Sequence, residues 1–290
     1  MNHGLGHGLN HSGSLYVVAT PIGNLQDITL RALEVLKHVD VIAAEDTRHT
    51  SGLLAHFAIQ KKLLPVHEHN ERKAAEQLLQ RLQAGESVAL VSDAGTPGIS
   101  DPGAVVVAAV RAAGIKVVPV PGPAAVIAAM SVAGIAASGF YFHGFLPASG
   151  GQRRSTLQAL ASLESTLVFY EAPHRVVDSV TDMAAILGHD RKLTIARELT
   201  KTFETIHQLT LGEAVAWLEA DSNQQRGEFV LLVEAAAPVE EQAVSAEAER
   251  VLRLLLEALP LKQAVKLAAD ITDAKKNALY ELALTLKNTD

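Results

Sequence analysis

The first 134 residues alternate short apolar runs with longer amphipathic stretches. Residues 14–20 and 86–92 carry short, nearly continuous apolar runs, which predict buried strands. Residues 71–84 repeat apolar positions every three or four residues and predict a helix that Gly85 ends. By the same criteria we expect strands at 39–45, 62–68 and 115–120, and helices at 29–38, 47–57, 101–114 and 122–134. Strands that alternate with helices in this way favour a mostly parallel sheet covered on both faces.

The alternation restarts after Gly139 with longer strands and fewer helices. A helix is expected to open at Ala172-Pro173 and to end at Gly188. Thr210 and Glu213 have the spacing of a capping box, which predicts the start of a further helix. Strands are expected at 165–171, 191–198, 203–211 and 227–235. This arrangement predicts a mixed sheet in the second half.

The two ends of the chain differ from the middle. Residues 1–13 contain four Gly and three His and predict a mobile tail. Residues 238–249 hold four acids and no base, which is typical of a linker. Beyond the linker, 246–260, 261–271 and 274–287 predict a small helical unit. Residues 250–290 contain seven Lys or Arg and five Asp or Glu, so this unit is a basic island of +2 in a chain of net charge −7.

The composition limits the class of protein. With 290 residues, 48% of them hydrophobic, the chain can bury cores for about two domains. The absence of Cys excludes thiol nucleophiles, disulfides and Cys-ligated metals. No apolar run reaches the roughly 18 residues of a membrane helix, and no signal pattern opens the chain, so we expect a cytoplasmic protein with no membrane partner. The net negative charge argues against non-specific coating of nucleic acid.

The most informative motif is SDAGTPGISDPG at 92–103, which follows a predicted strand and precedes a predicted helix. Ligands of open α/β sheets bind beyond the carboxyl ends of the strands, and Gly and Pro keep the backbone open there. The chain contains neither GxxxxGK[ST] nor GxGxxG, so a nucleotide pyrophosphate is not the obvious ligand. We expect Asp93, at the strand tip, to bind a ligand and Asp101 to cap the following helix.

A second loop of this kind, PVPGPAAV at 119–126, again joins a strand to a helix. Gly122 allows close approach of the backbone, and the two Ala that follow suit the flat face of an adenine or the aliphatic part of an amino acid. A tight turn that ends in a Pro-initiated helix would explain the same residues.

Charged residues follow several other strands. In AEDTRH (44–49), adjacent carboxylates beside Arg could orient a hydroxyl or shift a pKa. In HEHNER (67–72), His67 and His69 could ligate a metal, although His-x-His alone is weak evidence. EAPHR (171–175) and RELTK (197–201) carry bases that suit phosphate groups. Helix N-terminal acids, solvated loops and structural ion pairs are the alternatives for these clusters.

Eight ordered motifs together resemble one family. They are LYVVATPIGNLQDITLRALEVL, AAEDTRHT, HEHNER, VALVSDAGTPGISDPG, PVPGPAAV, FYEAPHR, ARELTK and GEFVLLVE. In this order they resemble the ribosomal RNA small subunit methyltransferase I family, which are 16S rRNA (cytidine-2′-O)-methyltransferases of the tetrapyrrole methylase superfamily. The resemblance covers residues 15 to about 235, and the basic tail resembles the family's C-terminal extension. The chain departs from the family in its Gly-rich N-terminal tail and in Ala124, where many relatives carry Ser.

The resemblance implies a fold, a cofactor and partners. It implies two α/β domains of the tetrapyrrole methylase type at 14–122 and 123–237, with S-adenosyl-L-methionine in the cleft between them, and a helical extension at 244–290. It also implies a homodimer without a metal, acting on a cytidine in the decoding region of 16S rRNA in the small ribosomal subunit. Carried over by motif, the cofactor contacts would be Asp93, Gly95, Thr96, Ala124, Ala125, Tyr170 and Leu199.

Methyl transfer to a ribose hydroxyl needs alignment and a group that handles the proton. Glu45 or Asp46 could accept this proton, with Arg48 or Arg175 on the flanking phosphates, and His67 and His69 remain candidates for the base. The expected RNA contacts are Arg175, Lys201, Lys262, Lys266, Lys275 and Lys276, and Arg153 and Arg154 could extend this surface. Two rival hypotheses are a metal-dependent hydrolase that uses His67, His69, Asp93 and Asp101, and an RNA-binding module that only assists ribosome assembly.

Overall fold

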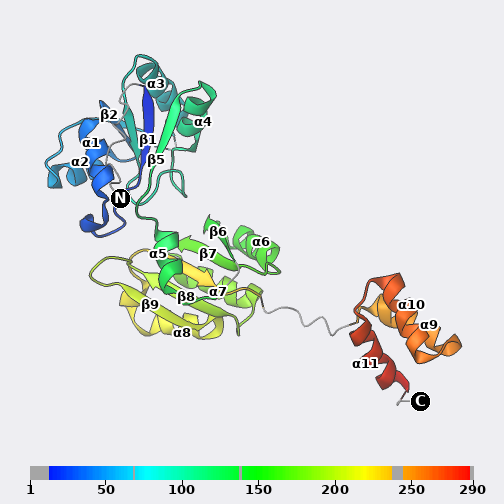
Figure 1. Ribbon diagram of the computed structural model, residues 1–290. Helices are drawn as coiled ribbons and strands as arrows, with labels where there is room; N and C mark the ends of the chain where they lie inside the picture. Colours follow the sequence, from blue (N-terminus) through cyan, green and yellow to red (C-terminus); the bar gives the residue numbers. More distant parts are fainter. Residues whose placement is uncertain (1–12, 68, 137–138, 237–243, 288–290) are drawn as a thin grey trace, which may run out of the picture. The chain divides into compact units, whose positions relative to one another are not determined.

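The computed structural model describes residues 13–67, 69–136, 139–236 and 244–287. The chain divides into two compact units, 1–235 and 236–290. In the part of the chain described, the first unit holds two five-stranded sheets and the second holds three helices (Figure 1). No helix in these ranges is long and apolar enough to cross a membrane. Residues 1–12 of the mobile tail expected at 1–13, and residues 237–243 of the linker region, lie outside the described residues.

The first sheet is parallel throughout and has the strand order β3-β2-β4-β1-β5. Helices α1 and α2 pack on one face and helices α3 and α4 on the other, so β2 and β4 are buried along their whole length. All five carboxyl ends therefore meet at one edge, as the alternating pattern predicted. The elements are β1 (Ser14–Val18), η1 (Leu25–Asp27), α1 (Leu30–His38), β2 (Val41–Ala44), α2 (Thr47–His56), β3 (Lys62–Pro65), α3 (Glu71–Gln83), β4 (Val88–Val91), α4 (Ala104–Ala112) and β5 (Lys116–Val120).

The second sheet is mixed, as expected, with the strand order β6-β7-β10-β8-β9. Strand β6 runs parallel to β7, and the other neighbouring pairs are antiparallel. Helices α6, α7 and α8 cover one face, and the short helix α5 covers part of the other. The elements are α5 (Ala125–Val132), β6 (Phe140–Phe145), α6 (Gly150–Leu160), β7 (Thr166–Glu171), α7 (Val176–Leu187), β8 (Lys192–Arg197), β9 (Thr205–Thr210), α8 (Leu211–Ala220), η2 (Ser222–Gln225) and β10 (Phe229–Val233).

The predicted start of α4 was wrong. The helix begins at Ala104, and Asp101 does not cap it. The carboxylate of Glu71, at the start of α3, accepts hydrogen bonds from the N–H groups of Gly103 at 2.8 Å and Val105 at 2.9 Å. A cap supplied from another helix leaves the Asp101 side chain available for a different role. The capping box of Thr210 and Glu213 is present as predicted.

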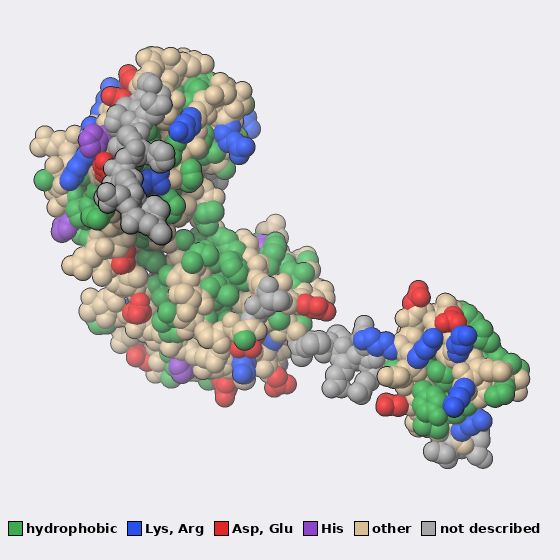
Figure 2. Space-filling model, in the orientation of Figure 1, with side chains coloured by type: hydrophobic (Ala, Val, Ile, Leu, Met, Phe, Trp, Pro, Cys, Tyr) green, Lys and Arg blue, Asp and Glu red, His purple; other side chains and the backbone are tan. Residues whose placement is uncertain are grey.

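The second unit is a three-helix cluster, as the amphipathic pattern predicted. Its core is made mainly of small side chains, including Ala264 and Ala268, together with Leu252 and Leu279. Figure 2 shows Lys and Arg side chains on the face of this unit that is turned to the viewer. The helices are α9 (Ala246–Ala258), α10 (Leu261–Thr272) and α11 (Lys276–Lys287).

Candidate functional site

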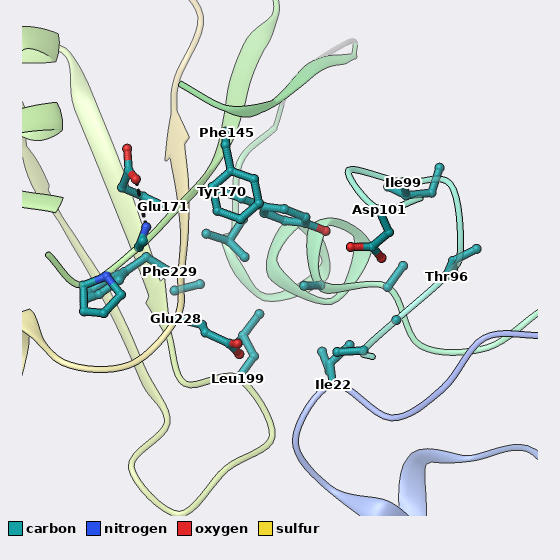
Figure 3. A pocket seen from close by; sticks show the side chains of 18 residues that line it. Ile22, Thr96, Ile99, Asp101, Phe145, Tyr170, Glu171, Leu199, Glu228 and Phe229 are labelled. Atoms are coloured by element: carbon teal, nitrogen blue, oxygen red, sulfur yellow. Dashed lines mark hydrogen bonds between the residues drawn. The ribbon is translucent and has the colours of Figure 1, made fainter. Parts of the chain in front are cut away.

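A hollow of about 350 Å³ opens in the first unit, between loops that follow strands of the first sheet and strands of the second sheet (Figure 3). The loop after β4, the start of α5 and the ends of β7, β8 and β10 all contribute. Its charged lining residues are acidic, with no Lys or Arg among them. The lining residues are Ile22, Ala94, Gly95, Thr96, Ile99, Asp101, Ala124, Ala125, Phe145, Tyr170, Glu171, Ala172, Pro173, Ala196, Leu199, Glu228, Phe229 and Val230.

Six of the seven residues carried over as cofactor contacts line this hollow. They are Gly95, Thr96, Ala124, Ala125, Tyr170 and Leu199. The seventh, Asp93, lines a different hollow, described below. Motifs that lie up to about a hundred residues apart in the sequence are thus brought around a single cavity.

The loop after β4 is fixed to its neighbours by hydrogen bonds. Gly95 has a φ of +78°, which a residue with a side chain rarely adopts. Its backbone exchanges two hydrogen bonds with Thr20, at 2.8 and 3.0 Å, at the end of β1. The hydroxyl of Thr96 donates to the carbonyl oxygen of Pro123 at 3.0 Å, just before α5. The two Gly- and Pro-rich loops therefore form one pre-arranged wall.

Sequence reasoning assigned Asp101 to a helix cap or to the rival hydrolase and not to a cofactor, but the structure places it in the lining of this hollow. Figure 3 shows its carboxylate and the Tyr170 hydroxyl pointing toward one another, and both residues line the hollow. Burial raises the pKa of Asp101 to about 6, and the negative charge of Glu45 adds to this effect, as does that of Asp93 more weakly. A hydrogen bond with the Ser92 side chain acts in the opposite direction. A carboxyl group in such a place is well suited to a cationic ligand.

Aromatic rings form the wall opposite the Asp101 loop. Phe145 and Tyr170 meet edge to face with their centroids 5.7 Å apart, and Phe142 supports Tyr170 from behind at 4.8 Å. The Tyr170 hydroxyl accepts a hydrogen bond from the N–H of Val126 at 3.1 Å, and burial raises the pKa of this phenol. The phenol therefore stays protonated and can donate a hydrogen bond into the hollow.

A second hollow, of about 360 Å³, includes Thr20, the partner of Gly95, in its lining. It is lined by Thr20, Pro21, Leu25, Arg48, His49, Gly52, Leu53 and Asp93. Asp93 accepts a hydrogen bond from the N–H of Asp46 at 2.9 Å, and its own N–H donates to the Glu45 carboxylate at 3.3 Å. The structure therefore groups Asp93 with the three catalytic candidates Glu45, Asp46 and Arg48.

These three candidates differ in chemical state. Asp46 caps α2 and pairs with Arg48 at 2.8 Å, and hydrogen bonds from Arg48 lower the pKa of Asp46 to about 2. Burial raises the pKa of Glu45, and the charges of Asp93 and Asp46 contribute, although a hydrogen bond from the Asp93 backbone opposes the shift. Glu45 is therefore the better proton acceptor of the two carboxylates near neutral pH. The Arg48 side chain is 90% exposed and can contact a large ligand.

The expected RNA contacts in the second sheet are engaged in ion pairs. Arg175 pairs with the fully buried carboxylate of Glu171 at 2.6 Å. Lys201 lies 2.8 Å from both Glu198 and Glu228. The structural ion pairs left open as an alternative are thus present, and RNA contact by either residue stays a prediction. Arg153, a candidate for extending that surface, is buried and pairs with Asp182 at 2.6 Å.

The metal-hydrolase hypothesis requires a cluster of metal-ligating side chains. Over the described ranges, no three His, Asp or Glu residues gather closely enough to hold a metal ion. The rings of His67 and His69 meet edge to face with centroids 6.2 Å apart, and neither residue lines the hollow that contains Asp101.

Two family models match the chain. The model described as Tetrapyrrole (Corrin/Porphyrin) Methylases matches residues 14–215, and the model described as RsmI C-terminal HTH domain matches residues 242–287. Among solved structures, a uroporphyrin-III C-methyltransferase from Thermus thermophilus, complexed with S-adenyl homocysteine, matches with a TM-score of 0.56 and 20% identity. That match covers 76% of this chain and 97% of the other, and it supports the fold.

Curated relatives match over almost the whole chain. A protein of Pseudomonas aeruginosa named Ribosomal RNA small subunit methyltransferase I is 56% identical over 274 residues, which cover 94% of this chain and 97% of the relative. A protein of the same name from Escherichia coli O157:H7 is 54% identical over 275 residues, with 95% and 96% covered. With these matches and the two sheets around one acidic hollow, the chain belongs to the ribosomal RNA small subunit methyltransferase I family of the tetrapyrrole methylases.

Proposed function

We propose that this protein transfers a methyl group from S-adenosyl-L-methionine to the 2′-hydroxyl of a cytidine in the decoding region of 16S rRNA, within the small ribosomal subunit. The observation that carries the proposal is the hollow itself: six residues assigned to the cofactor from motifs alone line one cavity. The relatives' shared name supports ribosomal RNA as the substrate. The family resemblance adds a homodimer that acts in the cytoplasm, with α/β domains at 14–122 and 123–237.

The residues of the first hollow fit this cofactor. S-adenosyl-L-methionine carries a positive sulfonium and an ammonium group, and the hollow contains acids without bases. Of these acids, Glu171 is bonded to Arg175 and Glu228 to Lys201, which leaves Asp101 to face a cationic ligand. The small side chains of Ala124 and Ala125 let a flat ring approach the backbone, and Tyr170 and Phe145 supply an aromatic wall.

When bound, the cofactor supplies an electrophilic methyl group. The chain's own residues then have two tasks. Asp101, Gly95 and Thr96 hold and orient the donor in the first hollow. Glu45, with its raised pKa, accepts the proton of the ribose hydroxyl, while the exposed Arg48 holds a neighbouring phosphate at the second hollow. We assign Asp93, which bonds to Asp46 and Glu45, to this acceptor side.

The second unit supplies further contacts to RNA. Lys262, Lys266, Lys275 and Lys276 lie on or beside α10 and α11, in the region matched by the model named for an HTH domain. Phosphate neutralisation by such bases contributes a large, salt-dependent share of affinity for RNA. We therefore propose that this unit docks the substrate and takes no part in the chemistry.

A transfer assay tests the proposal. Purified protein is incubated with methyl-labelled S-adenosyl-L-methionine and small ribosomal subunits from cells that lack the gene. The 16S rRNA is then digested to nucleosides. We expect the label in 2′-O-methylcytidine. Label in a methylated base, or no label in RNA at all, would overturn the proposal, and an Asp101→Ala variant serves as the control for cofactor-dependent transfer.

A further inference from the structure

The turn between β8 and β9 presents an aromatic side chain to solvent. Phe203, within this turn at 198–204, is 72% exposed, which is more than any other large aromatic residue of the described chain. Exposure of an aromatic ring to water is unfavourable. Packing within this chain therefore does not explain the exposed position of Phe203. The neighbouring side chains of Thr202 and Glu204 are polar and exposed.

Hydrogen bonds and ion pairs hold this turn in one conformation. The Arg197 guanidinium donates to the carbonyl oxygen of Phe203 at 3.1 Å. Lys201 binds Glu198 at 2.8 Å, and the N–H of Thr200 donates to Glu204 at 2.6 Å. Glu198 and Thr200 have positive φ values, +51° and +65°, which persist only where surrounding contacts enforce them. The turn that carries Phe203 is therefore pre-organised, and binding of a ligand to the ring costs little conformational entropy in this turn.

The same turn forms part of the rim of the first hollow. Leu199, four residues before Phe203, lines that hollow, and Lys201 is bonded to Glu228, which also lines it. The loop after β1 packs against the turn so closely that a Cβ atom on Gly23 would lie 2.5 Å from Lys201 Cγ and 2.9 Å from the carbonyl oxygen of Leu199. The turn that carries the exposed ring is thus held at the proposed methyl-donor site, with the loop after β1 packed against it.

We infer that Phe203 is a stacking platform for an unpaired base of the RNA substrate, next to the nucleotide that is methylated. This inference rests on the proposed function. A protein acting on a ribose in a confined site must engage a strand whose bases are splayed out, and aromatic rings are the usual partners of such bases. A single ring flanked by polar residues matches one planar base, whereas the core of a protein interface needs a contiguous apolar cluster.

Two variants and a matched control test the inference. Phe203→Ala removes the ring, Phe203→Trp keeps a stacking surface, and Phe140→Ala removes an exposed ring from β6, at the opposite edge of the same sheet. Loss of one stacked base corresponds to a KM for the small subunit raised roughly 5- to 150-fold. We expect this rise for Phe203→Ala alone, with kcat and calorimetric cofactor affinity unchanged, and near-normal KM for Phe203→Trp.

A spectroscopic measurement reports the stacking itself. The probe is a single-stranded 16S rRNA fragment with 2-aminopurine beside the target cytidine, whose fluorescence falls when the base stacks. We expect quenching by the unaltered protein and by Phe203→Trp, and none by Phe203→Ala.

The outcomes separate the inference from the function on which it rests. If the unaltered protein methylates the subunit while Phe203→Ala shows the same KM and the same quenching, the inference is refuted and the proposed function stands. A Phe203→Ala variant with a lower sedimenting mass and unchanged quenching would assign the ring to a contact between copies of the chain, which also refutes the inference. If the unaltered protein transfers no methyl group, the proposed function itself fails.

Discussion

Replacing Asp101 with Asn should weaken cofactor binding and, at the same time, stabilise the protein without cofactor. The substitution keeps the shape of the side chain and removes its charge. A hydrogen bond to a charged group contributes about 1.5–3 kcal/mol, so we expect S-adenosyl-L-methionine to bind roughly 10- to 150-fold more weakly to Asp101→Asn at neutral pH. Isothermal titration calorimetry measures this difference directly.

The pH dependence follows from the pKa of Asp101, which is raised to about 6. At pH 5 about one tenth of this carboxyl is ionised, so cofactor affinity of the unaltered protein should fall about tenfold between pH 7.5 and pH 5. The Asp101→Asn variant should show little change over this range. The matched control is Asp93→Asn, which removes a carboxylate from the second hollow and should leave cofactor affinity unchanged.

The Asp101→Asn substitution should weaken cofactor binding but stabilise the cofactor-free protein at neutral pH. Because the folded-state pKa of Asp101 lies above its ordinary value of 3.8, the stabilising contribution of this group is complete below pH 3.8 and is lost as pH rises through about 6. The difference between these two pKa values corresponds to at most about 3 kcal/mol in the free energy of unfolding. Because the group is partly exposed, solvent screening reduces this contribution to about 1 kcal/mol. At pH 7 the cofactor-free Asn variant should melt about 2–4 °C higher. Equal cofactor affinity for the variant and the unaltered protein, or weakened binding by Asp93→Asn alone, would refute this account of the hollow.

Three further predictions concern other parts of the molecule. Arg48→Ala should leave cofactor affinity nearly intact and lower methyl transfer to the subunit, and loss of cofactor binding in calorimetry would contradict the assignment of the second hollow to the acceptor. Deletion of residues 244–290 should preserve cofactor binding, because the two units have separate cores, and should weaken subunit binding and flatten the salt dependence of that binding. Equal salt slopes for the truncated and full-length proteins in filter binding would exclude phosphate contacts by this unit. Gly23→Ala should displace the 198–204 turn, destabilise the protein by about 1–3 kcal/mol and weaken cofactor binding. The control Gly151→Ala lies in α6 and meets nothing within 4 Å, so it should leave calorimetric cofactor affinity unchanged and stabilise the protein by about 0.5–1 kcal/mol in thermal unfolding.

Much of the fold was predictable because its information is local. In the first sheet, apolar runs of four or five residues are separated by amphipathic stretches, and parallel pairing follows from that alternation. The Gly- and Pro-rich loops could be assigned to a ligand because they follow buried strands. Strand β6 and helix α6 were not predicted: β6 exposes several apolar residues at a sheet edge, and α6 opens with Gly150 and Gly151, which lower helix propensity.

The position of Asp101 in the lining of the first hollow illustrates what local patterns do not contain. An Asp before Pro at the end of a loop has the sequence of a helix cap, and nothing nearby indicates otherwise. The actual cap, Glu71, is 32 residues away from Gly103 in the sequence and reaches α4 only in the folded chain. Arg175 was likewise expected to contact RNA, because its charge is evident from the sequence. The sequence does not show that its partner Glu171 is buried.

The most direct test of the central claim is a map of ribose methylation on 16S rRNA from cells that lack the gene, complemented with the unaltered chain or with Asp101→Asn. Mass spectrometry of the decoding-region fragment identifies the nucleotide and the position of the methyl group. We predict that one cytidine loses its 2′-O-methyl group without the gene, regains it fully with the unaltered chain, and regains it only in part with the variant. An unchanged 2′-O-methylcytidine in cells without the gene would contradict the account.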